Sequence, residues 1–401
     1  MIESSNPLPQ RPIDQQSDSL RELYRRLAED EAAREANAEL MQLSEEEARF
    51  AASQWTMIWR RFRRNRAAII GMVIVLFYYL VAAFGNFIAP YSLTTRFTKQ
   101  LYLPPQRVHL FDEGKLRPFV YGIESGYDES LRRVHKQTDE RIYLDFFAEG
   151  DSYKLLGLFE TNIHLFQAEG GIVSVLGTDR QGRDMFSRII LGSQISLTIG
   201  LVGVLMSLVF GTTLGIISGY YGGIVDELMQ RLIELVRAFP DIPLWMALSA
   251  ALPAGWSQLK TYFAVTLILS LIGWTWLARQ LRGQVLALRQ SDYVMAAKLA
   301  GASDARIIFR HLIPATFGQI IVVATLAMPA MIIAETALSF LGLGLRPPTT
   351  SWGVLLQESQ NLQSLALYPW VFTPAIVIVI VILAFSFMGD GLRDAADPYT
   401  I

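Results

Sequence analysis

The sequence contains no cysteine, and only 18% of its 401 residues are charged. The lack of cysteine excludes disulfide scaffolds, cysteine-based zinc sites, iron–sulfur clusters and thiol catalysis. Soluble domains carry about 25% charged residues, whereas this chain has 52% hydrophobic residues and a mean hydropathy of +0.30. This balance is typical of a polytopic membrane protein.

Sequence motifs of common catalytic sites are also absent. No Gly-x-x-x-x-Gly-Lys-Ser/Thr run occurs, so the chain has no P-loop for ATP phosphates. Neither His-Glu-x-x-His nor Gly-x-Ser-x-Gly occurs. The histidines lack metal-ligand spacing; they are His109, His135, His164 and His311. We therefore expect neither an enzyme nor a metal site, and the polar first residues predict no cleaved signal peptide.

Long apolar runs are abundant in the chain. A hydrocarbon core about 30 Å thick requires roughly 20 apolar residues in a helix. Six stretches meet this requirement: residues 67–88, 195–218, 232–252, 262–277, 320–341 and 371–388. The third is interrupted by Asp241 and two prolines, and the fourth is short. The pattern predicts an all-α polytopic membrane protein with six transmembrane helices.

Basic residues are distributed unequally between the ends of these spans. Five arginines directly precede the first span, and six basic residues lie between the fourth and fifth spans. The two short loops on the opposite side hold one basic residue each, Lys260 and Arg346. Because an excess of Lys and Arg in short loops marks the cytoplasmic face, we expect both termini in the cytoplasm of a bacterial inner membrane.

Two regions outside the spans are expected to be folded. Residues 1–66 contain capping-box patterns at Ser19 and Ser44, and Trp55 and Trp59 are interleaved with arginines as in a helix lying in the membrane interface. A simple positively charged stop before the first span is an equal alternative. Residues 90–192 are expected on the external side and are too long for a structureless loop.

The external segment contains apolar and aromatic runs that predict short β-strands around a small core. The expected core residues are Phe119, Tyr121, Tyr143, Phe146, Phe147, Leu155 and Leu156. We interpret the end of this segment as a salt-bridged structural turn that consists of Asp179, Arg183 and Asp184. Without cysteine, such a domain must be held by packing alone.

The segment 291–314, between the fourth and fifth predicted spans, has strong local signals. Gly301 has no Cβ and permits the left-handed conformation that ends a helix. Ser303 is a suitable N-cap for a second helix, and Pro314 marks the start of the next span. Small residues at Ala296 and Ala297 allow another protein to approach closely. A plain cytoplasmic linker of two helices is the alternative.

Two acidic residues lie within apolar runs. Glu335 costs at least roughly 2.5–3.5 kcal/mol inside a membrane unless it is paired or hydrated. We interpret Glu335 as a packing or gate residue facing a partner subunit, with direct substrate contact as the less favoured alternative. Asp241, between Pro240 and Pro243, is predicted to lie at a broken helix near the same cavity.

Several motifs in chain order resemble those of ABC importer permeases, in particular the C-type subunit of the dipeptide/oligopeptide group. The segment 293–314 resembles the EAA loop of that family. Its matching positions are Ala296, Ala297, Gly301 and Pro314, and its departures are Met295, His311 and Ile313. The runs 176–188, 219–226, 335–353 and 389–398 resemble further motifs of the group. The resemblance covers roughly residues 170–401.

This resemblance implies the type I (MetI-like) ABC importer permease fold with a small external insert. It implies that an ATPase subunit binds the coupling loop through Tyr293, Ala296, Ala297, Gly301, Ser303 and Pro314. The implied partners are a homologous second permease subunit, two ATPase subunits and an external solute-binding protein, without nucleic acid. ATP would be bound by the ATPase subunits, so no cofactor is expected here. We expect the insert to dock the binding protein, with a decorative domain as the alternative.

The resemblance leaves the substrate open among dipeptides, oligopeptides, nickel, opines and sugars. A stand-alone secondary transporter is the alternative function; it would have inverted repeats and ion-binding acidic residues at the midplane, for which only Glu335 and Asp241 are candidates. An intramembrane enzyme would require paired catalytic residues, which the sequence lacks. We expect five regions along the chain. They are a cytoplasmic helical N-terminal region (1–66), the first transmembrane helix (67–89), the external insert (90–192), a five-helix permease core (193–390) and a cytoplasmic tail (391–401).

Overall fold

The computed structural model describes residues 54–129, 133–253 and 255–396. The chain divides into two compact units, Met1–Arg60 and Arg61–Ile401. Helix α2 (Gln54–Phe62) lies across this division and confirms that the run of tryptophans and arginines is helical. The capping boxes predicted at Ser19 and Ser44 lie outside the described residues.

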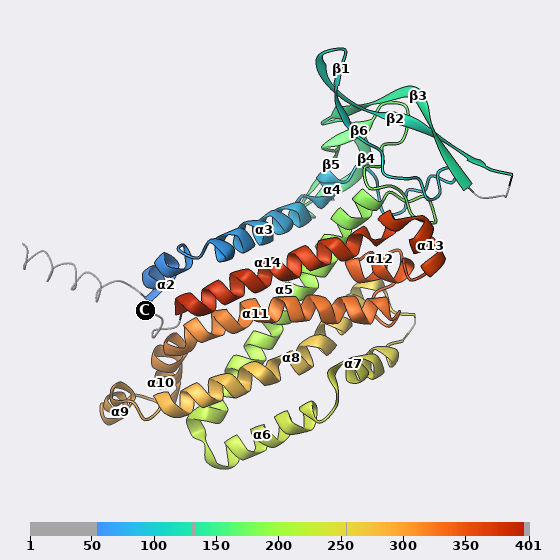
Figure 1. Cartoon of the computed structure of the whole chain (residues 1–401). Helices are drawn as coiled ribbons and strands as arrows, with labels where there is room; N and C mark the ends of the chain where they lie inside the picture. The colour runs from blue at the N-terminus through green and yellow to red at the C-terminus, as the bar shows by residue number, and fades with distance from the viewer. Residues whose placement is uncertain (1–53, 130–132, 254, 397–401) are drawn as a thin grey trace, which may run out of the picture. The chain divides into compact units, whose positions relative to one another are not determined.

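Within the described residues, five helical segments are long and apolar enough to cross a membrane. They are α3 (Arg66–Ala83), α5 (Met185–Tyr221), α8 (Gln258–Leu288), the continuous run of α10 (Asp304–Ile307), η1 (Ile308–Leu312) and α11 (Ile313–Phe340), and the run of η2 (Pro369–Phe372) and α14 (Thr373–Ala396). Helix α5 packs against α8 and α11, while α14 packs against α3 and α11 (Figure 1). The predicted helical membrane fold is confirmed.

The third predicted span differs in form from the expectation. Residues 232–252 do not make one helix, because α6 (Gly223–Arg237) ends before Pro240 and α7 (Asp241–Ala250) begins after it. Proline has no N–H to continue a helix and restricts the residue before it. The break also leaves α6 and α7 loosely attached, since Ile233 and Ser249 are their only buried residues among those described.

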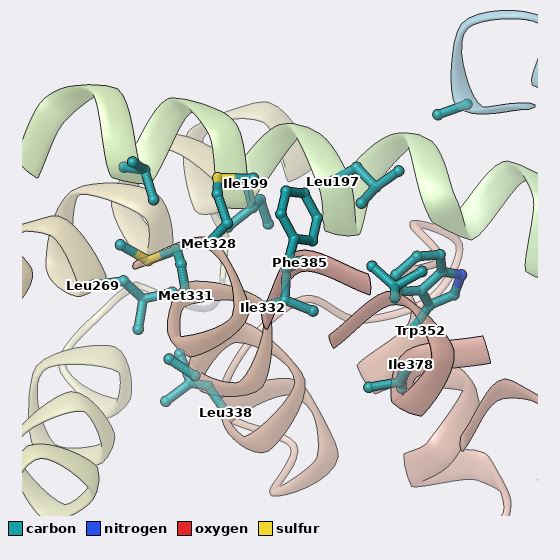
Figure 2. Packing of buried hydrophobic residues seen from close by; sticks show 14 of the residues in the cluster. Leu197, Ile199, Leu269, Met328, Met331, Ile332, Leu338, Trp352, Ile378 and Phe385 are labelled. Carbon is teal, nitrogen blue, oxygen red and sulfur yellow. The ribbon is translucent and has the colours of Figure 1, made fainter. Parts of the chain in front are cut away.

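The main apolar core lies between α5, α8, α11 and α14. Figure 2 shows Leu197 and Ile199 of α5 facing Met328 and Ile332 of α11, with Phe385 of α14 beside them. These side chains are at most 5% exposed. Interdigitated apolar side chains of this kind hold the bundle at near-crystalline packing density.

Glycines set the closest approach of α5 to α8 and the turn that follows α5. The turn uses Gly222 and Gly223, whose φ angles are +67° and +54°, values that glycine adopts without steric cost. Gly219, three residues earlier, lies inside α5. A Cβ at Gly219 would be 2.8 Å from the Arg282 carbonyl oxygen of α8, so its role is helix packing.

The insert consists of two antiparallel sheets that follow the short helix α4 (Gly85–Ile88). The first has the order β1 (His109–Asp112), β2 (Lys115–Tyr127), β3 (Arg133–Phe146) and β6 (Phe166–Ala168). The second pairs β4 (Glu149–Leu155) with β5 (Phe159–Ile163). The predicted β-domain is therefore present, although β2 and β3 are long strands of 13 and 14 residues.

The core of the insert differs in part from the predicted set. Its buried cluster consists of Val120, Ile142, Leu144, Phe166 and Val173. Phe119 is buried as expected, but three predicted core residues are more than half exposed: Phe146, Phe147 and Leu156. Phe147 and Leu156 have positive φ angles and lie at turns, where the alternation of a strand no longer decides which side chain faces the core.

The insert ends earlier than predicted and is bound tightly to the helices. Because α5 begins at Met185, the insert ends at residue 184 rather than 192. The Trp370 indole of η2 donates to the Thr178 carbonyl over 3.0 Å, and the rings of Tyr102 and Tyr368 stack with centroids 4.0 Å apart. The short helices α12 (Trp352–Glu358) and α13 (Leu362–Leu367) lie between α11 and η2.

Candidate functional site

The segment 291–314, the coupling segment, folds as its local signals predict. Helix α9 (Asp292–Leu299) ends at Gly301, which has a φ of +79°. The Gly301 N–H donates to the Lys298 carbonyl and the Ala302 N–H to the Ala297 carbonyl, each over 3.0 Å. This pair of bonds is the Schellman motif, so the predicted left-handed helix end is confirmed.

The second helix of the coupling segment also begins where predicted. Ser303 Oγ accepts a hydrogen bond from the Arg306 N–H over 3.4 Å as the N-cap of α10. Asp304 in the first turn accepts from the Tyr220 hydroxyl over 2.7 Å. Pro314 is at the start of α11, where its missing N–H costs little. One turn of π-helix joins α10 to α11.

The inner face of the coupling segment is attached to the ends of two membrane helices. Its buried residues are Val294, Ile307 and Leu312, and they pack with residues at the ends of α5 and α8. Those residues are Ile216, Tyr220 and Val285. The Lys298 ammonium lies 5.1 Å from the centre of the Tyr220 ring, a cation–π distance. A displacement of α9 is therefore transmitted to α5 and α8.

The outer face of the coupling segment is exposed and apolar. Leu299 is 88% exposed and Phe309 is 71% exposed, with Tyr293 and Met295 about half exposed. Ala296 is exposed as predicted, but Ala297 is half-buried and packs against the inner cluster. Sequence reasoning missed Leu299 and Phe309, although their signal was present as apolar side chains on a short, otherwise polar helical segment. An exposed apolar surface of this kind is typical of a protein interface.

An ion pair fixes the turn beside the coupling segment. Arg282 of α8 donates to both carboxylate oxygens of Asp226 at the start of α6, over 2.5 and 2.6 Å. This hydrogen bonding lowers the pKa of Asp226 below its ordinary value of 3.8. Arg289 donates to the carbonyl oxygens of Gly219 and Tyr220. The ends of α5, α6 and α8 are thus held together next to α9.

Glu335 is enclosed inside the chain. Its side chain has no exposed surface and accepts hydrogen bonds from Ser339 over 2.8 Å and from Ser196 of α5 over 3.2 Å. Ser196 in turn accepts from the Trp352 N–H at the start of α12. The expectation that Glu335 faces a partner subunit is wrong, because serine partners within the same chain satisfy the buried carboxyl.

Asp241 lies at the predicted helix break but not beside Glu335. It is the first residue of α7, follows Pro240 and is exposed. One enclosed and one exposed carboxyl do not share a cavity. The structure therefore separates the two acidic residues that the sequence placed together, and it assigns Glu335 to packing between α5, α11 and α12.

The turn before α5 contains a buried network of charges. Asp179 accepts from Arg183 over 2.7 Å and from Arg188 over 2.6 Å, and both arginines also bind Glu358 of α12. The predicted salt-bridged turn is present, and sequence reasoning missed Glu358. Burial acts to raise the pKa of Glu358, but the guanidinium groups of Arg188 and Arg183 outweigh it and lower the pKa below 4.5.

Asp184, the third predicted residue of this turn, has a separate role. It caps α5 by accepting from the Ser187 N–H over 2.7 Å and also accepts from the Ser174 hydroxyl over 2.6 Å. Burial raises the pKa of Asp184 in spite of these hydrogen bonds. The whole turn is therefore structural, as predicted, and joins the insert to the start of α5.

Comparisons with known proteins match most of the chain. The family model described as "binding-protein-dependent transport system inner membrane component" matches residues 211–400, and the model described as "N-terminal TM domain of oligopeptide transport permease C" matches residues 53–105. The dipeptide transport system permease protein DppC of Lactococcus lactis subsp. cremoris (strain MG1363) is 34% identical over 361 residues, which are 88% of this chain and 93% of that protein.

A second curated relative and a solved structure are also similar to the chain. The oligopeptide transport system permease protein OppC of Bacillus subtilis (strain 168) is 31% identical over 347 residues, which are 86% of this chain and 90% of that protein. Among solved structures, an inward-facing form of the MetNI methionine ABC transporter is 15% identical with a TM-score of 0.41, over 53% of this chain and 97% of that chain.

Proposed function

The chain belongs to the family of binding-protein-dependent transport system inner membrane components, and from this premise we propose that it imports peptides as half of an ATP-driven translocation path. The relatives that it matches over most of its length are named as dipeptide and oligopeptide permeases. The other half of the path is a homologous membrane subunit. The chain itself catalyses no reaction.

The observation that carries this proposal is the two-sided coupling segment. Its outer face presents Leu299 and Phe309 to solvent, and its inner face is packed on α5 and α8. An ATPase subunit that binds the outer face and closes on ATP pushes α9 and thereby moves the membrane helices. Such rigid-body rocking of a helical bundle is a common form of switching transition. In this proposal Gly301 fixes the angle between α9 and α10.

The loosely attached helices α6 and α7 are the proposed surface for the second membrane subunit. Their exposed apolar residues include Ile224, Leu228, Leu235 and Ile242, all at least half exposed in this chain alone. A homologous partner would bury this face and enclose the path between the two subunits.

We place the coupling segment in the cytoplasm and the insert outside. Arginines 282 and 289 lie at the coupling end of α8, and this excess of basic residues marks the cytoplasmic side of a bacterial inner membrane. Helix α5 starts at the insert and reaches the coupling segment 37 residues later, a length of about 55 Å at 1.5 Å per residue. The insert is then available to an external solute-binding protein.

The absence of cysteine from the sequence allows a direct test. A single cysteine replaces Leu299 in the complete transporter, and a cross-linker joins it to the ATPase subunit. We expect a cross-link from Leu299→Cys and none from Leu158→Cys, a comparably exposed leucine of the insert. Uptake of radiolabelled trialanine that depends on the binding protein tests the substrate class. No cross-link from Leu299→Cys, or no peptide uptake, would refute the corresponding part of the proposal.

A further inference from the structure

A cavity of about 440 Å³ opens at the insert end of the bundle. It lies between the α7–α8 connection and the α11–α12 connection, and its walls come from residues 249–261 and 343–349. The second wall is continuous with α12, whose Trp352 indole donates to the Ile189 carbonyl in the first turns of α5. The volume is in the range of small-molecule sites, and none of the functional residues described above lines it.

Two hydroxyl groups in the wall of the cavity lack hydrogen-bond partners. Ser249 Oγ and Thr349 Oγ1 are buried atoms for which the described residues offer no partner, and the Ser249 residue is only 5% exposed. Buried polar groups are nearly always hydrogen-bonded, and an unsatisfied one costs about 1–3 kcal/mol. Because these atoms are buried, both residues line the cavity through other atoms, and their enclosed hydroxyl oxygens are not open to a ligand.

The charged side chain in the cavity wall is that of Arg346. Its guanidinium donates to the Gly342 carbonyl over 3.2 Å and is otherwise exposed, while none of the cavity-lining residues in the described part of the chain is acidic. Gln258, the first residue of the 31-residue helix α8, also lines the cavity, and a helix start carries partial positive charge. The cavity is thus electropositive.

An apolar surface completes the site. Trp256 and Leu345 line the cavity beside the polar groups. A guanidinium that can bind a carboxylate through two parallel hydrogen bonds, together with an indole surface, matches the chemistry of a short peptide with a free carboxyl end.

We propose that this cavity is a peptide site on the translocation path, in which Arg346 binds the terminal carboxylate and the Trp256 indole packs against the peptide. The site receives peptide at the external mouth before it passes between the two membrane subunits. This inference rests on the proposed function in peptide import. It adds the residues that bind the peptide and the part of the peptide, its terminal carboxylate, that they recognise.

The test uses the complete transporter in lipid nanodiscs without the binding protein. Ligand-detected NMR measures binding of trialanine and of trialanine amide, which lacks the terminal carboxylate. We expect the wild type to prefer trialanine, Arg346→Gln to weaken trialanine binding about tenfold or more, and Arg346→Lys to weaken it less, because lysine retains the charge but not the paired geometry. Binding of the amide should change little in either variant.

Matched variants separate binding from structure. Lys260→Gln removes the basic residue that the sequence places in the other short external loop. Lys260 lies in the first turn of α8 and does not line the cavity, so its replacement should leave binding unchanged. Ser249→Ala should leave trialanine binding unchanged, because the enclosed hydroxyl does not face the cavity, and should leave the thermal stability of the empty transporter equal or higher, since it removes an unsatisfied buried group. Equal effects of Lys260→Gln and Arg346→Gln would overturn the proposal.

Four further outcomes are decisive. If the wild type binds trialanine and its amide equally, or if Arg346→Gln no longer assembles with the second membrane subunit, the proposed site is wrong. Uptake of trialanine through the binding protein is measured in parallel in proteoliposomes. If the wild type takes up trialanine but Arg346→Gln binds trialanine as well as the wild type does, this inference alone is refuted. If the wild type takes up no peptide, the proposed function is refuted.

Discussion

The two ends of the helical bundle are stabilised in opposite ways. At the coupling end, residues close in sequence form a local motif, with Gly301 and Ser303 two positions apart and an exposed apolar face. At the insert end, Arg188 and Glu358 bind each other across 170 residues of chain and are largely buried. The coupling end presents the apolar surface that the proposed contact with an ATPase subunit requires, whereas the insert end is held by buried ion pairs.

The largest expected difference between the ends is their accessibility from outside the cell. In intact cells, a membrane-impermeant maleimide should label Leu158→Cys in the insert and should not label Leu299→Cys in the coupling segment, although both side chains are more than three quarters exposed in the isolated chain. Both should react after the membrane is permeabilised in cells that lack the ATPase subunit, which is proposed to cover Leu299. Labelling of Leu299→Cys in sealed cells would reverse the proposed orientation.

The buried network around Arg188 at the insert end and the Arg282–Asp226 pair at the coupling end should contribute very differently to the free energy of unfolding. Arg188 is 1% exposed, and its replacement by methionine leaves Asp179 and Glu358 with fewer partners. Breaking a buried charge network typically costs about 3–5 kcal/mol. Arg282 is 29% exposed, so Arg282→Met should cost about 1 kcal/mol. Thermal unfolding in detergent measures both, and equal losses would contradict the contrast between the two ends.

A matched pair of glycines tests whether the coupling segment carries function. Gly301 and Gly114 have φ angles of +79° and +80°, and neither would place a Cβ within 4 Å of another group. Valine at either position therefore introduces the same backbone strain, on the order of 1–2 kcal/mol. We expect Gly301→Val to lower transport and stimulated ATPase activity about tenfold while the protein still inserts, and Gly114→Val to leave both within about twofold. Similar activities of the two variants would remove Gly301 from the coupling mechanism.

The comparison of the two ends also explains which features could be predicted from the sequence. The helix end at Gly301, the N-cap at Ser303 and the break at Pro240 follow from rules that act over a few residues, and all three are present. The partners of Glu335 could not be predicted, because Ser196 lies 139 residues away and only the folded helices bring it close. The partners of a residue that acts through such distant contacts can be identified only in the folded structure.

In the β-strands of the insert, too, contacts between residues distant in sequence could not be predicted from the local pattern. Composition predicted a packed β-domain, and the alternation of Ile142 and Leu144 agrees with a core-facing strand. The exposure of Phe146 and Phe147 depends on where β3 ends and how β6 pairs with it. Strand pairing is set by contacts across the sheet rather than by local preference, so these two residues were placed incorrectly.

Protonation should weaken the network at the insert end. The pKa of Glu358 is lowered in the folded chain, so its charge stabilises the fold above its ordinary pKa of 4.5, and this contribution is lost as pH falls through the lower folded value. The stability difference between wild type and Glu358→Gln should therefore be constant near neutral pH and shrink below about pH 4.5. Thermal unfolding at several pH values measures this difference, and a difference that grows on acidification would contradict the assigned ion pairs.

The smallest expected effect concerns the distal arm of the insert, formed by residues 123–127 of β2 and 133–137 of β3. The arm lies beyond the buried cluster of Val120, Ile142 and Leu144, and Tyr127 at its outer part is 64% exposed and bonded to Arg133. Replacing 123–137 with Asn-Gly joins Gly122 to Thr138 by a two-residue hairpin turn and preserves the core. If the insert docks the binding protein through this arm, the affinity for the binding protein should fall several-fold while basal ATPase activity is unchanged. Leu158→Asp, on the neighbouring hairpin, is the control for altered surface charge. Unchanged affinity and uptake in the shortened protein would make the arm decorative and leave docking to the region around the cavity at Arg346.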